Sequence, residues 1–210
     1  MKPFFTTLII FFCLSLQAQE NKGTAPDHKG FYLSMGLGPV FGGIDFKTNE
    51  SGIPSQQKWT GTGAIFDLKI GGTLKENLIL HGTIISNSLP GPKIETNSGS
   101  GKATNNLNIG EAMIGGGLTY YFMPSNIFLS GSLGLGNYTL LNTDTDTNIS
   151  TDRGLGMQLK VGKEWWVSKR WGLGVAASYG KTSVNNKIGN GVTEKLNSNR
   201  FGIMFSASLN

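Results

Sequence analysis

The chain has 210 residues, of which 31 are glycine, about twice the usual share, while charged residues make up only 15%, well below the level typical of soluble globular proteins. The formal net charge of +5 comes from basic residues that are dispersed along the chain rather than clustered. This distribution excludes the basic patch of a nucleic-acid-binding protein, so we expect no nucleic-acid partner.

The first 18 residues have the features of a secretory signal peptide. Lys2 precedes an apolar run over 4–16, and small or polar residues follow before Gln19. This run is shorter than the roughly 20 residues of a membrane-spanning helix, so we expect cleavage after Ala18 rather than anchoring. Cys13 would leave with the peptide, and the mature chain would form no disulfide. The remaining chain divides into a mobile polar leader at 19–29 and one domain at 30–210.

Segments that alternate apolar residues with small or polar ones follow one another through this domain. A period of two is the signature of a strand with two unlike faces. Strands are therefore predicted at 30–46, 61–74, 78–87, 107–122, 127–141, 153–167, 171–184 and 199–209. Pro39 falls inside the first of them, so we expect a bulge or irregularity there. The segment at 78–87 alternates least cleanly of the eight.

The connections between these segments alternate between long and short. Their lengths are roughly 14, 3, 19, 4, 11, 3 and 14 residues, and an even number of strands with tight turns at one end and long loops at the other is typical of outer-membrane barrels. The predicted fold is all-β, an eight-stranded antiparallel up-and-down transmembrane β-barrel. Its short turns and both termini would be periplasmic, and its long loops extracellular.

Aromatic residues gather beside the tight turns and at the start of the domain. Trp and Tyr prefer membrane interfaces, where a ring can lie at headgroup level. The predicted periplasmic girdle consists of Phe31, Tyr120, Phe122, Trp165, Trp166 and Trp171. The alternative is that aromatic residues form the core of a soluble, lipocalin-like barrel, which would be extracted without detergent.

Charged residues in the middle of the predicted strands occupy the same alternate positions as the small and polar residues, and therefore lie on the same face of each strand. A lysine on the lipid face at mid-bilayer costs about 2–4 kcal/mol, so these side chains are assigned to the interior. An eight-stranded barrel is just wide enough for side chains to fill it, and buried charges need partners, so we expect an ion-pair network that plugs the barrel. The predicted network comprises Asp67, Lys69, His81, Glu111, Lys160, Glu164 and Arg200. Lys160 anchors this assignment, since a lipid-facing Lys160 would undermine the parity of every strand.

With its signal peptide, eight alternating strands, three tight turns and four long loops, the chain resembles the small outer-membrane barrel family that includes OmpA-type transmembrane domains. The resemblance covers essentially the whole mature chain. It departs from the family at the end, which reads Ser208-Leu209-Asn210 where such barrels often finish with an aromatic residue. It implies an outer-membrane location, contact with outer-membrane lipid and lipopolysaccharide, insertion by the barrel-assembly machinery, and a monomer.

Signals for chemistry are weak. His28 and His81 are the only histidines, and no cluster of His, Ser and carboxylate can be assigned. Asp144 and Asp146 have the spacing that opens a calcium loop, but Ile149 stands where that loop needs glycine. We therefore predict no enzyme activity, cofactor or metal site, and a structural or surface-interaction role carried by the extracellular loops. A narrow porin-like channel is the first alternative, and a lipid-modifying barrel enzyme is the second.

Overall fold

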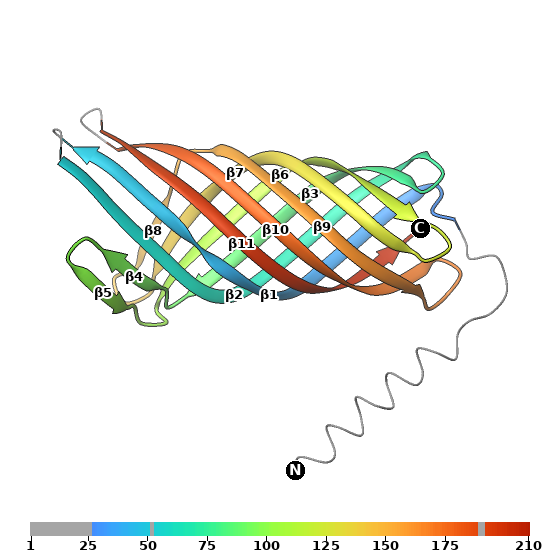
Figure 1. Cartoon of the computed structure of the whole chain (residues 1–210), viewed down its shortest axis with the longest axis horizontal. Helices are drawn as coiled ribbons and strands as arrows, with labels where there is room; N and C mark the ends of the chain where they lie inside the picture. The colour runs from blue at the N-terminus through green and yellow to red at the C-terminus, as the bar shows by residue number, and fades with distance from the viewer. Residues whose placement is uncertain (1–26, 51–52, 189–191) are drawn as a thin grey trace, which may run out of the picture.

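The computed structural model describes residues 27–50, 53–188 and 192–210 (Figure 1). The predicted signal peptide and the leader up to residue 26 lie outside these ranges, and within them no helix is long and apolar enough to cross a membrane. The described residues form β1 (Phe31–Glu50), β2 (Ile53–Lys75), β3 (Leu78–Pro90), β4 (Lys93–Thr96), β5 (Gly99–Lys102), β6 (Leu107–Phe122), β7 (Ile127–Asn142), β8 (Thr147–Ser150), β9 (Gly154–Trp166), β10 (Trp171–Ile188) and β11 (Val192–Leu209).

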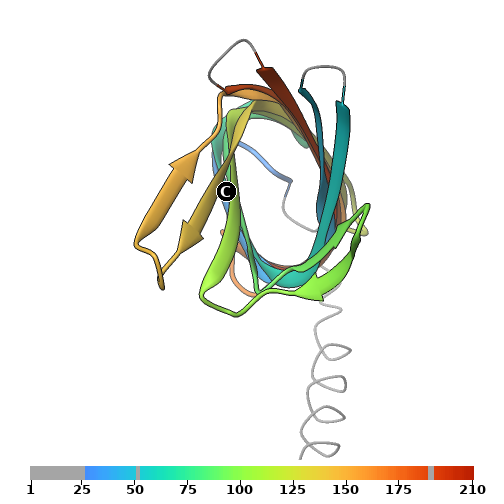
Figure 2. The ribbon, with the colours of Figure 1, turned by 90° about the vertical axis from the view of Figure 1, so that its left-hand side faces the viewer.

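Eight of these strands close into a ring. Neighbouring strands pair antiparallel in the order β1-β11-β10-β9-β7-β6-β3-β2, and β1 pairs with β2 to complete the circle (Figure 2). The tight turns β2–β3, β6–β7 and β9–β10 lie at the same end as the C-terminus (Figure 1). The predicted eight-stranded antiparallel barrel is therefore confirmed.

All four connections that were predicted as long loops contain strand. β1 and β2 remain paired as far as Glu50↔Ile53, and β10 and β11 as far as Ile188↔Val192. The predicted loop at 88–106 holds the hairpin β4–β5, which pairs with β2, and the one at 142–152 holds β8, which pairs with β7. Polar composition did not distinguish loop from strand here, because a strand beyond the lipid can carry polar residues on its outer face.

The irregularity expected near Pro39 is present as an interruption of one ladder and not as a bulge. The β1–β2 register is unshifted through Pro39↔Ala64, and the β1–β11 ladder omits only positions 38 and 39 before resuming in register at Val40↔Gly202. Proline has no N–H to donate, so the ladder is interrupted without an extra residue. A register shift occurs instead between Thr73 and Lys75, beside the turn into β3.

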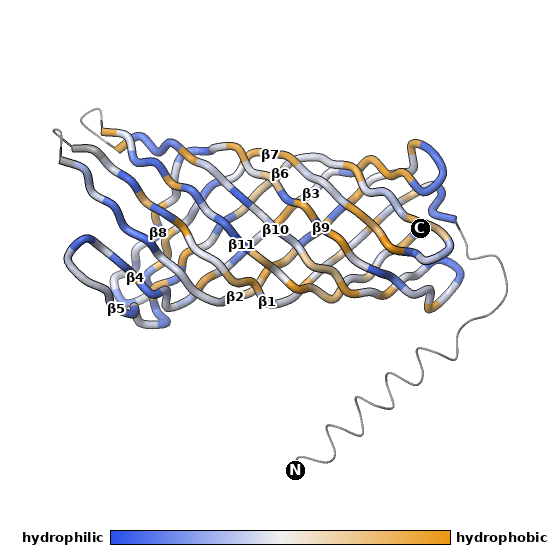
Figure 3. The backbone as a smooth tube through the Cα atoms, viewed as in Figure 1, coloured by the Kyte–Doolittle hydropathy of each residue, from blue (hydrophilic) through white to orange (hydrophobic). Residues whose placement is uncertain are grey.

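The outer face of the ring is apolar on every side. Exposed apolar side chains come from each of the eight strands, and one from each is Leu37, Ile70, Ile84, Ile114, Leu133, Leu159, Leu173 and Ile203. Hydrophobic and hydrophilic positions alternate along the strands, and the end that carries β4, β5 and β8 is mostly hydrophilic (Figure 3). A soluble protein rarely exposes an apolar patch of more than a few hundred Å², so a continuous belt indicates a lipid-facing surface.

The inner face holds apolar side chains as well as charges. Near the tight turns, a small cluster contains Tyr32, Ile79, Tyr121, Phe128 and Ala176. A larger cluster, toward the opposite end, contains Val40, Ile44, Ile65, Ile85, Leu89, Ile109, Met113, Tyr138, Val184, Leu196 and Met204. In β3, the strand that alternated least cleanly, His81 and Thr83 are buried while Leu80 and Ile84 are exposed, so His81 faces the interior.

Candidate functional site: the barrel interior

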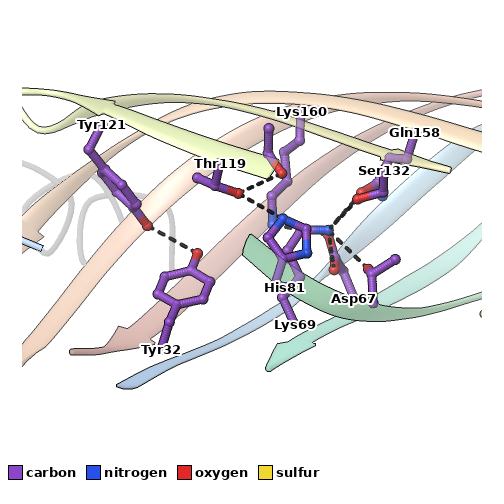
Figure 4. Close-up of polar contacts among 11 residues, drawn as sticks. Tyr32, Asp67, Lys69, His81, Thr119, Tyr121, Ser132, Gln158 and Lys160 are labelled. Atoms are coloured by element: carbon purple, nitrogen blue, oxygen red, sulfur yellow. Dashed lines mark hydrogen bonds and ion pairs between the residues drawn. The ribbon is translucent and has the colours of Figure 1, made fainter. Parts of the chain in front are cut away.

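Asp67 is paired with two lysines in the middle of the barrel (Figure 4). Asp67 and Lys69 point inward from β2, and Lys160 reaches them from β9. The Nζ atoms of Lys69 and Lys160 each lie 3.0 Å from a different carboxylate oxygen of Asp67. The side chains of Asp67 and Lys69 are 0% exposed and that of Lys160 is 2% exposed. Buried charges are tolerated when paired and hydrogen-bonded, and this carboxylate gives each ammonium its own oxygen.

Lys69 also connects β2 with its neighbour β3 and with two strands across the ring, β7 and β9. Its Nζ donates to Thr83 Oγ1 on β3 at 3.2 Å, to Ser132 Oγ on β7 at 3.4 Å and to Gln158 Oε1 on β9 at 3.1 Å (Figure 4). With Asp67, these acceptors surround the three protons of the ammonium. The side chain of Lys69 therefore crosses the interior and occupies its centre.

A second ion pair lies toward the far end from the tight turns. Glu111 on β6 pairs with the Arg200 guanidinium on β11, and its Oε1 accepts a 2.7 Å hydrogen bond from Thr182 Oγ1. The guanidinium carbon of Arg200 lies 5.9 Å from the centre of the Tyr138 ring. A cavity of about 20 Å³ beside this pair has room for about one water molecule.

Hydroxyl groups extend the polar interior toward the tight turns. Tyr121 donates to Glu164 Oε2 at 3.2 Å, and its oxygen lies 3.1 Å from the Tyr32 hydroxyl (Figure 4). Ser208 Oγ donates to the same oxygen of Glu164 at 2.6 Å. These bonds stabilise a carboxylate that has no ion-pair partner within the described ranges.

His81 belongs to a separate hydrogen-bonded chain. Its Nε2 lies 3.0 Å from Thr119 Oγ1, which in turn donates to Ser130 Oγ at 2.8 Å. Its Nδ1 has no hydrogen-bond partner among the described residues. The same residues contain no group of three or more His, Cys, Asp or Glu that is placed to hold a metal ion.

The structure places all seven residues of the predicted network inside the barrel, but not in one network. Lys69, Asp67 and Lys160 form one group, and Glu111 and Arg200 form another. Glu164 and His81 are buried among hydroxyl groups instead of opposite charges.

His28 is a residue of the interior that the sequence assigned to the mobile leader. It is fully buried, its ring stacks on Tyr121 with centroids 3.5 Å apart, and its Nε2 lies 2.8 Å from Asn126 Oδ1. Its main-chain N–H donates to Asn77 Oδ1 at 3.0 Å. These contacts tie the last part of the predicted leader to two of the tight turns and fill the barrel mouth at that end.

Most residues of the predicted aromatic girdle face outward near the tight turns. Phe31, Tyr120, Phe122 and Trp171 are exposed, and Trp165 is half-buried with the Nζ of Lys163 5.7 Å from its ring centre. Trp166 differs, because its ring lies 4.9 Å from that of His28 in the barrel mouth. Trp166 is two residues from Glu164 on β9, so the alternation of the sequence already predicted that both side chains face inward.

The sequence matches no family model and no curated protein. Among solved structures, this one is similar to Neisserial surface protein A, with a TM-score of 0.54 and 14% identity over 86% of this chain and 96% of that one. It is also similar to the outer membrane protein OprG from Pseudomonas aeruginosa, with a TM-score of 0.50 and 14% identity over 87% of this chain and 98% of that one. The chain has the fold of the small outer-membrane β-barrels. At this level of identity the similarity concerns the fold alone.

Within this outer-membrane barrel fold, the charges of the interior balance. The carboxylates are Asp67, Glu111 and Glu164, and the cations are Lys69, Lys160 and Arg200. These charged side chains and the two apolar clusters lie inside an eight-stranded ring, a size that side chains can fill, whereas water-filled channels are found in barrels of about 16–18 strands.

Proposed function

We propose that this protein is an integral outer-membrane barrel with a closed interior and a structural or surface-interaction role carried by its outer hairpins. The tight turns and both termini would be periplasmic, and the long hairpins would face the outside. We further propose that it is a monomer inserted by the barrel-assembly machinery. The observation that carries the proposal is the buried group Asp67, Lys69 and Lys160, which spans the lumen between β2 and β9.

A closed interior follows from what an open path would require. Ions could pass only if Asp67 separated from its lysines, and breaking a buried ion pair costs about 3–5 kcal/mol. His28 and Tyr121 would also have to leave the mouth near the tight turns. At the other end, the apolar cluster around Ile65 and Met204 lies beside the Glu111–Arg200 pair, where the cavity has room for about one water molecule.

A role at the surface follows from how the outer hairpins are built. The hairpins β1–β2 and β10–β11 pair with each other as far as Thr48↔Glu194, so four strands continue beyond the apolar belt as one sheet. A sheet held by backbone hydrogen bonds presents its side chains in a fixed order, as recognition by a partner requires.

The test combines location with conductance. Cell fractionation and a gel run with and without boiling should place a heat-modifiable protein in the outer membrane, and the purified barrel should give no steady conductance in planar bilayers. Reproducible conductance steps would favour the narrow channel, and altered lipid A on expression would favour the lipid-modifying enzyme. Release of the protein without detergent would overturn membrane insertion itself.

A further inference from the structure

Five exposed lysines share the outward face of the sheet that β2, β1, β11 and β10 form beyond the apolar belt. This lysine face consists of Lys47, Lys58, Lys181, Lys187 and Lys195. None of the five forms an ion pair within residues 27–50, 53–188 and 192–210. Within the four strands, the described part of this face holds one carboxylate, Asp45, which stands opposite Lys58. Two more carboxylates border the face, since Glu95 of β4 lies opposite Lys58 on its other side and Asp152 Oδ2 accepts a hydrogen bond from the main-chain N–H of Lys187. The excess of positive charge is therefore concentrated at Lys47, Lys195 and Lys181, which have no carboxylate opposite them among the described residues of the paired strands.

The register places two of these lysines directly against each other. Lys47 lies opposite Lys195 in the β1–β11 pair, with Gln56 and Asn185 flanking them on β2 and β10. Like charges directly opposite each other destabilise a sheet. The row of four adjacent hydrogen-bond donors suits an anion with several oxygens, which would also relieve the repulsion between the lysines.

The height of this row above the apolar belt indicates which anion can reach it. Phe41, Phe201 and Tyr179 lie side by side in register and form an aromatic row at the border of the belt, where rings prefer headgroup level. From position 41 to position 47, a strand that rises about 3.3 Å per residue and tilts by about 40° climbs roughly 15 Å along the barrel axis. By the same arithmetic, Lys181 stands about 5 Å above the aromatic row.

A phospholipid headgroup is too short for most of this face. Headgroups add only about 5–8 Å to each side of the hydrocarbon core, which brings a phospholipid phosphate to Lys181 but not to Lys47 and Lys195. Phosphates at the height of this pair must be carried on a headgroup several sugars tall. Two exposed carboxylates, Asp144 and Asp146, lie on the β7–β8 connection, across the ring from β1.

We propose that the lysine face binds phosphate groups on the sugars of a phosphorylated glycolipid in the outer leaflet, with Lys47 and Lys195 at the centre of the site. This inference rests on the proposed outer-membrane location. A bound phosphate would offset the repulsion between Lys47 and Lys195, which the sheet alone leaves uncompensated.

The test uses the mature protein in neutral detergent, with folding verified beforehand by heat-modifiable migration. The probes are lipopolysaccharide with a phosphorylated core, the same lipid after enzymatic dephosphorylation, and phosphatidylglycerol, with binding measured by calorimetry. Replacing Lys47 and Lys195 together by Gln should weaken binding of the phosphorylated glycolipid by about 30-fold. Phosphatidylglycerol binding should not change.

Matched variants separate the site from general charge. Lys102→Gln with Lys169→Gln removes two exposed lysines elsewhere, on β5 and in the β9–β10 turn, and should leave glycolipid binding within about twofold of wild type, because the charge effect falls off within a Debye length. Lys195→Glu should raise thermal stability without lipid, since it places a carboxylate opposite Lys47, while it abolishes glycolipid binding.

Three results would overturn the proposal. These are equal binding of the dephosphorylated glycolipid, an equal loss in the Lys102 and Lys169 control, and a parallel loss of phosphatidylglycerol binding, which would assign the face to phospholipid. A protein that migrates as a folded barrel but binds no glycolipid contradicts this inference alone. A protein that never shows heat-modifiable migration contradicts the proposed function instead.

Discussion

Asp67→Asn is the substitution that most directly tests the closed interior. It keeps the shape of the side chain but removes the carboxylate that, among the described residues, pairs with Lys69 and Lys160, whose Nζ atoms both lie 3.0 Å from it. Two ammonium groups then remain buried without a counter-charge. Because removing one partner from a buried ion pair costs about 3–5 kcal/mol, we expect the free energy of unfolding to fall by at least that amount.

Two comparison variants separate charge from packing. Lys160→Met leaves Asp67 paired with Lys69 and should cost less than Asp67→Asn, because no buried charge loses its last partner. The triple replacement of Asp67, Lys69 and Lys160 by Leu, Met and Met removes all the charges and should recover most of the lost stability, since apolar replacement of buried ion pairs is often neutral or stabilising.

The assay is urea unfolding of the barrel in lipid vesicles, followed by tryptophan fluorescence and by gel migration without boiling. The reasoning would be refuted if Asp67→Asn unfolded at the same urea concentration as wild type, or if the triple variant were the least stable of the set. Either outcome would mean that the lysines are hydrated by water in the lumen, and the narrow channel would then be the better function.

Three further pairs of substitutions test other parts of the structure. Gly115→Ala should destabilise the barrel by about 1–3 kcal/mol, because its Cβ would collide with the carbonyl oxygen of Leu133, whereas Gly116→Ala, which points outward, should be tolerated in the same urea titration. Leu133→Lys at mid-depth on the lipid face should cost about 2–4 kcal/mol and Val167→Lys beside a tight turn about 0–1 kcal/mol, and equal costs in vesicle unfolding would contradict the placement of the belt. His28→Ala should speed amide exchange at the end of the leader while His28→Phe preserves the protection by keeping the stacking, which hydrogen-exchange mass spectrometry can follow.

The facing of the strands could be predicted from the sequence because lipid and a filled lumen impose opposite demands on alternate residues. Lys160 illustrates this, since its parity alone placed it inside, where it pairs with Asp67. The partition of the interior into separate groups could not be predicted, because it depends on which strands face each other across the ring. Parity says that Glu111 and Arg200 point inward, but only the closed barrel brings them together.

The ends of the strands were harder to predict than their faces. In the segments at 47–60 and 185–198 the outer residues are polar, so composition favoured loops, although inward Trp59 and Leu196 continued the alternation. His28 offered no periodic signal at all. Its burial depends on stacking with Tyr121, which lies far away in the sequence and becomes a neighbour only when the barrel closes.

The paired hairpins beyond the belt also determine how the exposed end of this protein can diversify. Ile44 and Leu196 pack into the apolar cluster of the lumen, while Lys47 and Lys195 beside them face outward. Sequence change that keeps this packing is therefore confined to alternate positions, spaced about 6.6 Å apart along each strand. An antibody against this end would contact the outward side chains at alternate positions of each strand. Substitutions that abolish its binding would have to change these side chains while the inward side chains keep their packing.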